Sequence, residues 1–168
     1  MFRTINDFLG VWKDEAEMTR KVFAVLTDAS LTRSINNDHR TIGRLAWHIT
    51  QTIPEMLGKV GLTLTGPGEH DAVPSSTKTI VEAYSAAAGS LAGAIAAAKW
   101  TDAALADENE MYGEKWTVAF SLRAFVLHQV HHRGQITVLM RQAGLRVPGL
   151  YGPAKEDWAT YGMPVPEI

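Results

Sequence analysis

The chain of 168 residues contains no cysteine, so disulfide bonds, thiolate metal ligands and a cysteine nucleophile are all excluded. It has no polybasic segment, and its formal net charge of -2 gives no electrostatic reason to expect nucleic acid or an acidic membrane as a partner. No apolar run approaches the length needed to cross a bilayer, and no signal-type stretch follows the N-terminus. We therefore expect a cytoplasmic protein without nucleic-acid or membrane partners.

Length and composition predict one domain over residues 1–168, because a chain of this size builds one sizeable core more readily than two. Apolar residues make up 46% of the sequence and charged residues 20%, which is the balance of an ordinary globular protein. The sequence contains no internal repeat, and the prolines and glycines from Leu145 onward predict an irregular tail.

Four segments have the three-to-four spacing of apolar residues that is typical of amphipathic helices. We place these helices at about residues 6–27, 41–59, 76–100 and 117–143. No segment shows a convincing alternating strand pattern, so the sequence predicts an all-α four-helix bundle. The connections 62–75 and 101–115 are longer than tight turns, and at least one of them could cross an end of the bundle.

The last helix carries two histidines, His128 and His132, at a spacing of four residues. This spacing places both imidazoles on one helical face, about 40° apart around the axis, where they could bind one metal ion. The same face carries Phe125 and Leu139, so the histidines are expected to point inward. The alternative is a pair of core histidines bonded to carbonyl or hydroxyl groups, and the helix by itself leaves both interpretations open.

A metal site needs a further ligand, and His48 is our candidate because it lies at the edge of the apolar stripe of the second helix. His131 is expected to be a neighbour of the pair, whereas His39 and His70 fall in turns and are expected to be solvated.

Two further polar residues lie near these histidines in the helical pattern. Gln135 follows His132 on the same strip and could orient a ligand or a bound water. Glu55 lies on the same side of the second helix as His48 and could act as a base, although a surface glutamate is the simpler interpretation. No residue is identified as catalytic from the sequence.

Three segments together resemble the DinB/YfiT-like superfamily of small metal-binding four-helix proteins. They are Arg44–Ile49, His128–Gln135 and Met140–Gly144. The resemblance covers nearly the whole chain, and the His-His-Arg-Gly-Gln run is its most specific part. It implies a four-helix bundle with a long connection, a homodimer, and one divalent metal ion. The ligands that it implies are a histidine of the second helix and both histidines of the last one, which are here His48, His128 and His132.

Three histidine ligands leave at least one coordination position open, which is typical of catalytic metal sites. Zinc or nickel is the expected ion, with manganese or iron as alternatives, since all accept imidazole ligands. The open position could bind a small thiol as its thiolate or a water as hydroxide.

Characterised members of the resembled family suggest a thiol transferase or a hydrolase, and we consider three hypotheses. The first hypothesis is a metal-dependent transferase that joins a low-molecular-weight thiol to an electrophilic substrate. The second is a metal-dependent hydrolase, and the third is a non-catalytic, stress-associated protein that binds a metal or ligand. Since the chain has no cysteine, a thiol would have to come from a separate molecule.

Overall fold

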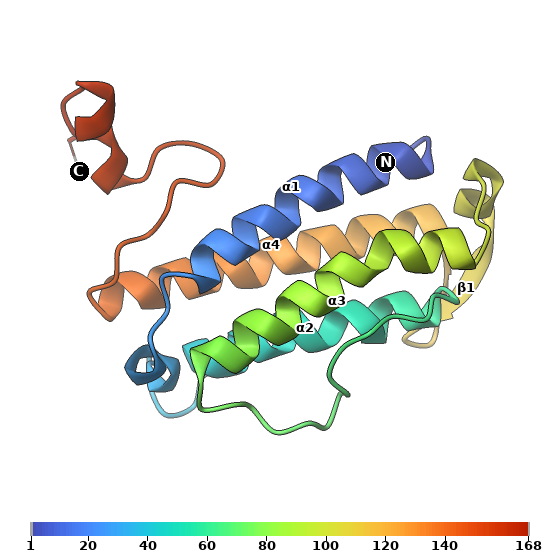
Figure 1. The fold of residues 1–168 in the computed structure, drawn as a ribbon, viewed down its shortest axis with the longest axis horizontal. Helices are drawn as coiled ribbons and strands as arrows, with labels where there is room; N and C mark the ends of the chain where they lie inside the picture. The colour runs from blue at the N-terminus through green and yellow to red at the C-terminus, as the bar shows by residue number, and fades with distance from the viewer. Residues whose placement is uncertain (1, 168) are drawn as a thin grey trace.

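The computed structural model describes residues 2–167, and four α-helices account for half of it (Figure 1). The helices are α1 Ile5–Phe23, α2 Ile42–Lys59, α3 Thr77–Ala97 and α4 Val118–Gln142. Three short 3-10 helices accompany them: η1 Asp28–Thr32, η2 Asp102–Ala106 and η3 Lys155–Tyr161. The predicted helical bundle is confirmed.

The helices do not follow one another around the bundle in chain order. Both α1 and α2 pack against α3 and α4, so α1 and α2 lie on opposite sides of the bundle. Figure 1 shows that α2 and α3 run in one direction while α1 and α4 run in the other. The connection 60–76 therefore returns along the length of the bundle, which is the departure from up-and-down order that its length suggested.

Threonines determine where three of the helices begin. Thr4, Thr41 and Thr117 each accept a hydrogen bond from the backbone N–H three residues ahead, which satisfies a donor that the first turn leaves free. At the other end of α4, Gly144 has φ of 71°, a left-handed conformation that glycine adopts without strain.

The expectation that the chain contains no strand was wrong. An antiparallel hairpin joins β1 Glu108–Met111 to β2 Glu114–Thr117. Its two turn residues, Tyr112 and Gly113, have φ of 55° and 86°, as a tight hairpin turn requires. The segment was difficult to recognise because it is rich in acidic residues and a tyrosine occupies the first turn position.

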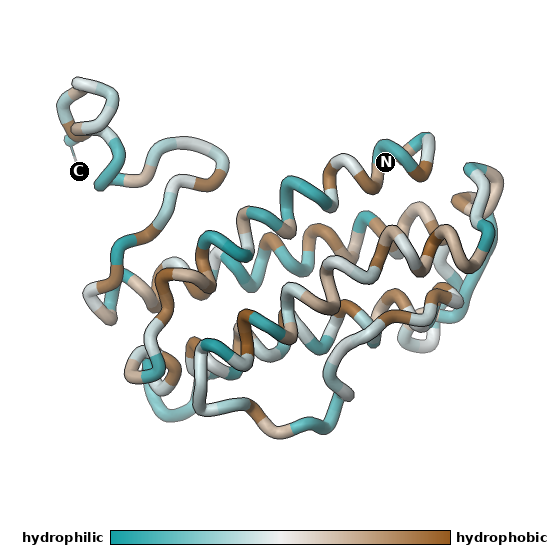
Figure 2. The backbone as a smooth tube through the Cα atoms, in the orientation of Figure 1, coloured by the Kyte–Doolittle hydropathy of each residue, from teal (hydrophilic) through white to brown (hydrophobic). Residues whose placement is uncertain are grey.

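Hydrophobic and hydrophilic residues alternate along α1 with the helical period (Figure 2). Aromatic pairs link the helices inside, with ring centroids 4.8 Å apart for Trp12 and Phe125 and 5.1 Å apart for Phe23 and Tyr84. Such pairs add to the stability that burial of their apolar surface provides. They join α1 to both α4 and α3.

Among residues 2–167, only α3 is long and apolar enough by composition to span a membrane. The sequence-based expectation of no such run overlooked the alanines, whose mild hydropathy accumulates over this helix. Length and apolar composition do not by themselves identify a membrane span, because core helices of soluble proteins can have both. Here α3 packs its larger side chains, including Ile80, Tyr84 and Leu91, into the bundle.

The largest fully buried side chain belongs to a charged residue, Arg133 of α4. Its guanidinium group donates to the backbone oxygen of Glu15 and to Thr19 Oγ1, both at 3.0 Å, and it forms an ion pair with the Glu15 carboxylate. The Tyr151 hydroxyl accepts from Arg133 and donates to Glu15 Oε2 at 2.7 Å. A buried charge requires such a complete set of partners.

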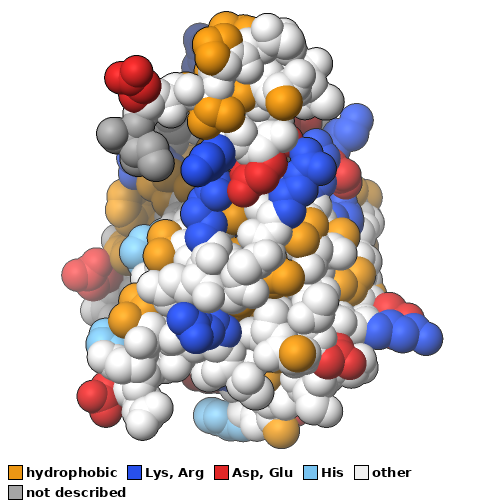
Figure 3. Space-filling model, turned by 90° about the vertical axis from the view of Figure 1, so that its left-hand side faces the viewer, with side chains coloured by type: hydrophobic (Ala, Val, Ile, Leu, Met, Phe, Trp, Pro, Cys, Tyr) orange, Lys and Arg blue, Asp and Glu red, His pale blue; other side chains and the backbone are white. Residues whose placement is uncertain are grey.

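The segment after α4 is held to the bundle by polar contacts in addition to Tyr151. Ion pairs join Arg141 to Glu156 at 3.0 Å and Arg146 to Asp157 at 2.8 Å. Figure 3, which views the molecule from the end where this segment lies, shows basic and acidic side chains close together below its hydrophobic residues. The tail is therefore attached through charges, one tyrosine hydroxyl and the packing of Leu145, Val147 and Leu150 against the core.

We predict that Tyr151→Phe lowers the free energy of unfolding by about 1 kcal/mol, because it removes a hydroxyl that hydrogen-bonds two buried charged groups. The Tyr151 side chain is itself 64% exposed, and a substitution at such a surface position ordinarily has little effect. Urea denaturation measures the difference. Tyr161→Phe, at 66% exposure, is the matched control, and equal stability of both variants would contradict the prediction.

Candidate metal centre

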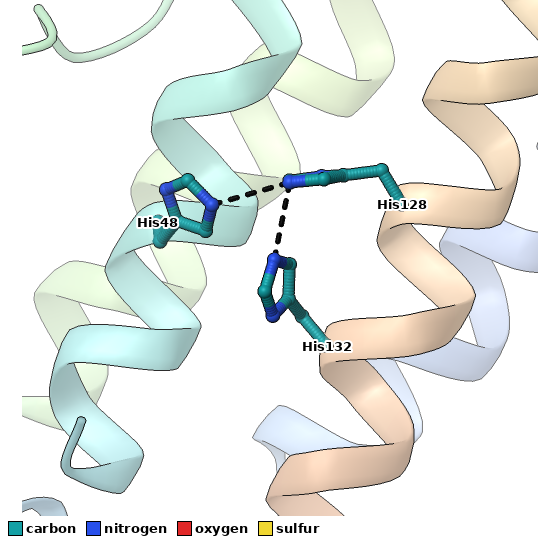
Figure 4. A group of neighbouring side chains, drawn as sticks. All are labelled: His48, His128 and His132. Carbon is teal, nitrogen blue, oxygen red and sulfur yellow. Dashed lines mark hydrogen bonds between the residues drawn. The ribbon is translucent and has the colours of Figure 1, made fainter. Parts of the chain in front are cut away.

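His48, His128 and His132 come together between α2 and α4, with their rings pointing toward one another (Figure 4). The Nε2 atom of His128 lies 3.2 Å from Nε2 of His48 and 3.1 Å from Nε2 of His132. One nitrogen from each residue lies within 4.8 Å of those of the other two. The structure thus brings together all three residues that the sequence singled out as ligands.

The spacing of these nitrogens suits a first-row metal ion. In a tetrahedral site with metal–nitrogen bonds of about 2.0–2.1 Å, two ligand nitrogens are about 3.3 Å apart. The observed separations of 3.1 and 3.2 Å are close to that value. Without an ion, the one hydrogen or the one lone pair on His128 Nε2 would have to serve both short contacts, whereas a cation would accept all three lone pairs. The geometry therefore fits a three-histidine metal site.

A buried glutamine holds the two helices in register beside the histidines. Gln129 Nε2 donates to the backbone oxygen of Ile49 at 2.9 Å and to Thr52 Oγ1 at 3.3 Å. Because Gln129 follows His128 and Ile49 follows His48, this bond fixes the separation of the two ligands on different helices. Sequence analysis missed this role, since a glutamine on a helix gives no sign of which helix it will meet.

Gln135 orients one of the histidines, as the sequence suggested. Its Oε1 atom lies 2.7 Å from His132 Nδ1. An amide oxygen only accepts, so Nδ1 carries the hydrogen and Nε2 keeps a lone pair for a metal ion. The amide nitrogen of Gln135 donates to His131 Nε2 at 3.1 Å, which makes exposed His131 a neighbour of the cluster.

The cluster is kept uncharged by its surroundings. Burial, followed by the positive charge of Arg40, lowers the pKa of His48 to about 3. Burial also lowers the pKa of His128 to about 4 and, with a smaller opposing effect of the Gln135 hydrogen bond, lowers that of His132. Neutral imidazole is the form that binds metal ions. The Nδ1 atom of His128 is buried and has no hydrogen-bond partner among the described residues.

Two cavities open on the histidines from different sides. A polar cavity of about 290 Å³ is bordered by His48 and His128, and an apolar one of about 420 Å³ by His132. Arg40 lines both of them. The apolar cavity is formed largely by four aliphatic side chains, which are Ile35, Leu45, Val138 and Leu139. The arrangement could therefore place two different molecules beside one reactive centre.

The wall of the polar cavity comes partly from the unpredicted hairpin. The Tyr112 hydroxyl donates to Glu55, with oxygen–oxygen distances of 2.9 and 3.2 Å to the two carboxylate oxygens. Burial, together with this hydrogen bond, raises the pKa of Tyr112. Lys59 also approaches Glu55, at 3.8 Å. Glu55 therefore borders the site as expected, but it is engaged by two neighbours rather than free to act as a base.

Neither His39 nor His70 is part of the cluster, although His39 lines the apolar cavity that His132 borders. His39 and His70 are exposed, and His39 Nδ1 contacts Asn36 Oδ1. Gly134 is also exposed, and a side chain placed there would meet no neighbouring atom. The homodimer that the family resemblance implies stays a prediction.

Fold and site together define a four-helix-bundle protein with a candidate three-histidine metal centre between its second and fourth helices. The chain belongs to the DinB family, whose model matches residues 1–166. This agrees with the resemblance based on the histidine motif.

Similar proteins include one from Bacillus subtilis (strain 168), the uncharacterized protein YrdA, which is 41% identical over the full length of both chains. The crystal structure of a DinB-like protein from Bacillus cereus ATCC 10987 is 43% identical, with a TM-score of 0.81 over 90% of this chain and 100% of that one. A DinB-like protein from Bacillus subtilis, YjoA, shares the fold at 12% identity, with a TM-score of 0.68 over 88% of this chain and 99% of that one.

We predict that the metal-free protein loses stability as the pH falls from about 6.5 to about 4. The pKa values of the three histidines are lowered in the folded state, so the unfolded chain binds more protons in this range and is favoured by acid. Urea midpoints measured at several pH values test this. A His128→Gln variant, with one such group fewer, should show a weaker dependence, and a midpoint independent of pH would contradict the prediction.

Proposed function

We propose that the chain binds one divalent metal ion through His48, His128 and His132 and uses it to activate a small thiol for transfer to an electrophile. The observation that carries this proposal is the convergence of three neutral imidazole nitrogens, at separations of 3.1 and 3.2 Å, between two cavities of opposite character. Zinc or nickel suits these ligands best, while manganese or iron would also accept them.

A bound divalent ion would favour the thiolate over the thiol at neutral pH. The surroundings of the histidines suit that chemistry. Arg40 adds positive charge beside the cluster, and this charge lowers the pKa of His48, so the imidazole stays neutral. In the transfer, the sulfur forms a bond to an electrophilic carbon, and the bond from this carbon to its leaving group breaks. The leaving group departs with the electron pair, and the thiol proton passes to solvent.

The apolar cavity is suited to the electrophile. Its aliphatic lining, with Val138 and Leu139 on α4, would bind an apolar group and displace water from the side of His132. The polar cavity, with its charged residues, is suited to the thiol. A hydrolase would use the same open coordination position for water, and assays without thiol distinguish it from the transferase.

We predict that wild-type protein, purified without a tag and without added metal, contains close to one equivalent of a divalent metal. His48→Ala and His128→Ala should contain little, because each removes one of three ligands. Elemental mass spectrometry measures the content and identifies the ion. His39→Ala and His70→Ala, which alter exposed histidines outside the cluster, should match wild type. A metal-free wild type that also refuses zinc and nickel on titration would refute the site.

For the activity, we predict that the metal-loaded protein consumes a thiol and an electrophile together, in equal amounts. A labelled thiol, such as L-cysteine, with 1-chloro-2,4-dinitrobenzene as the electrophile provides the assay. A chelator or His128→Ala should return the rate to the uncatalysed background, since the thiol is then no longer activated.

Three results would point away from the transferase or support an alternative. Ester hydrolysis that needs metal but no thiol would instead indicate the hydrolase. Failure of both reactions in protein that retains its metal would leave a non-catalytic metal-binding or ligand-binding protein. Equal rates with wild type and His128→Ala would show that any observed transfer does not depend on the cluster.

A further inference from the structure

The polar cavity carries charges of opposite sign on either side of the histidines. Arg44, His48 and Glu55 lie at spacings of four and seven residues along α2, so they occupy one face of the helix. At a rise of 1.5 Å per residue, Arg44 and Glu55 are about 16 Å apart along the axis, with His48 between them. All three border the cavity. A ligand that lies along α2 would thus meet a cation first, then the candidate metal position, then an anion.

The positive end is built from Arg40 and Arg44. Neither arginine is within ion-pair distance of a carboxylate among residues 2–167. Arg44 Nη1 instead donates to Gln51 Oε1 at 3.0 Å, and the amide nitrogen of Gln51 donates to backbone oxygens of the connection 60–76, including Gly68 at 2.7 Å. The guanidinium group of Arg44 is therefore held in place while its charge stays available for a carboxylate.

The negative end is built from Glu55 and Glu69. Glu55 accepts the Tyr112 hydroxyl and has Lys59 at 3.8 Å, which compensates its charge only in part because Lys59 lies near the surface. Glu69 also borders the cavity and has no basic side chain within ion-pair distance in the described part of the chain. This end would attract an ammonium group and repel a carboxylate.

We propose that the polar cavity binds the thiol as a zwitterion, with its carboxylate at Arg40 and Arg44 and its ammonium group at Glu55 and Glu69. The sulfur would lie between them, at the histidines. The inference rests on the proposed function, of which it names the substrate class. A cavity of about 290 Å³ is at the small end of ligand sites, which suits a molecule of dipeptide size whose two charged groups are on different residues.

Four matched thiols test the two charges separately. They are L-cysteinylglycine, its N-acetyl derivative, its C-terminal amide, and the derivative that is both acetylated and amidated. Calorimetry measures the affinity of each for zinc-loaded protein at one pH. The zwitterion should bind about tenfold more tightly than either singly charged derivative, which corresponds to about 1.4 kcal/mol for each charged contact. Zinc content, measured before and after each titration, verifies that the peptide has not removed the ion.

Two variants assign each charge to its end of the cavity. Arg44→Gln should weaken only the thiols that have a free carboxylate, by about tenfold. Glu55→Gln, whose amide oxygen can still accept from Tyr112, should weaken only those with a free amine. A free amine also lowers the pKa of the thiol, which could itself change the affinity for the zinc-loaded protein. The contact between the ammonium group and Glu55 is therefore judged from the change in affinity that Glu55→Gln causes, and not from the affinities of the wild type alone. Arg123→Gln and Glu82→Gln, which alter exposed charges outside the cavity, are the controls.

The outcomes separate this inference from the proposed function. Selective losses in the two variants would support the zwitterion. Equal affinity for all four thiols, unaffected by either variant, would overturn the zwitterion and leave the thiol transferase standing. Failure of every thiol to bind protein that holds its zinc would overturn the transferase, and the inference with it.

Discussion

The contact between α2 and α4 is the constraint on which the site depends. It brings a histidine of one helix within 3.2 Å of a histidine on another, 80 positions along the chain. The bond from Gln129 to the Ile49 carbonyl holds this contact at the level of the histidines themselves. Since the glutamine is fully buried, a shift of either helix would leave its amide nitrogen without a partner. The two helices therefore have little freedom to separate at the site.

The same segment of α4 connects the histidines to the rest of the bundle. His128 and His132 face the cleft, whereas the residues that follow them, Gln129 and Arg133, turn to α2 and α1. The site is thus supported from both sides by buried polar side chains directly beside it. Through Arg133 the support extends to Tyr151 in the tail, which completes the hydrogen bonds of the buried ion pair.

The electrostatics of the site combine a neutral cluster with charged surroundings. Burial keeps the imidazoles unprotonated, and the positive charge of Arg40 nearby strengthens that preference. The opposite end of the polar cavity is negative and includes Glu55, which the hairpin tyrosine contacts. The neutral imidazoles that could bind a cation therefore lie between a positive and a negative end of the polar cavity. The apolar cavity on the other side combines four aliphatic side chains with polar residues that include Asp38 and Arg40.

The sequence by itself determined the four helices, the inward direction of His128 and His132, and, through the family resemblance, the choice of His48. These features depend on helical periodicity and on motif spacing, both of which are local properties of the chain. Only the tertiary structure decided which helices are neighbours, that Arg133 is buried, and that the hairpin brings Tyr112 to Glu55. Each of these depends on contacts between residues far apart in the sequence, and periodicity along one helix contains no information about which other helix will cover its face.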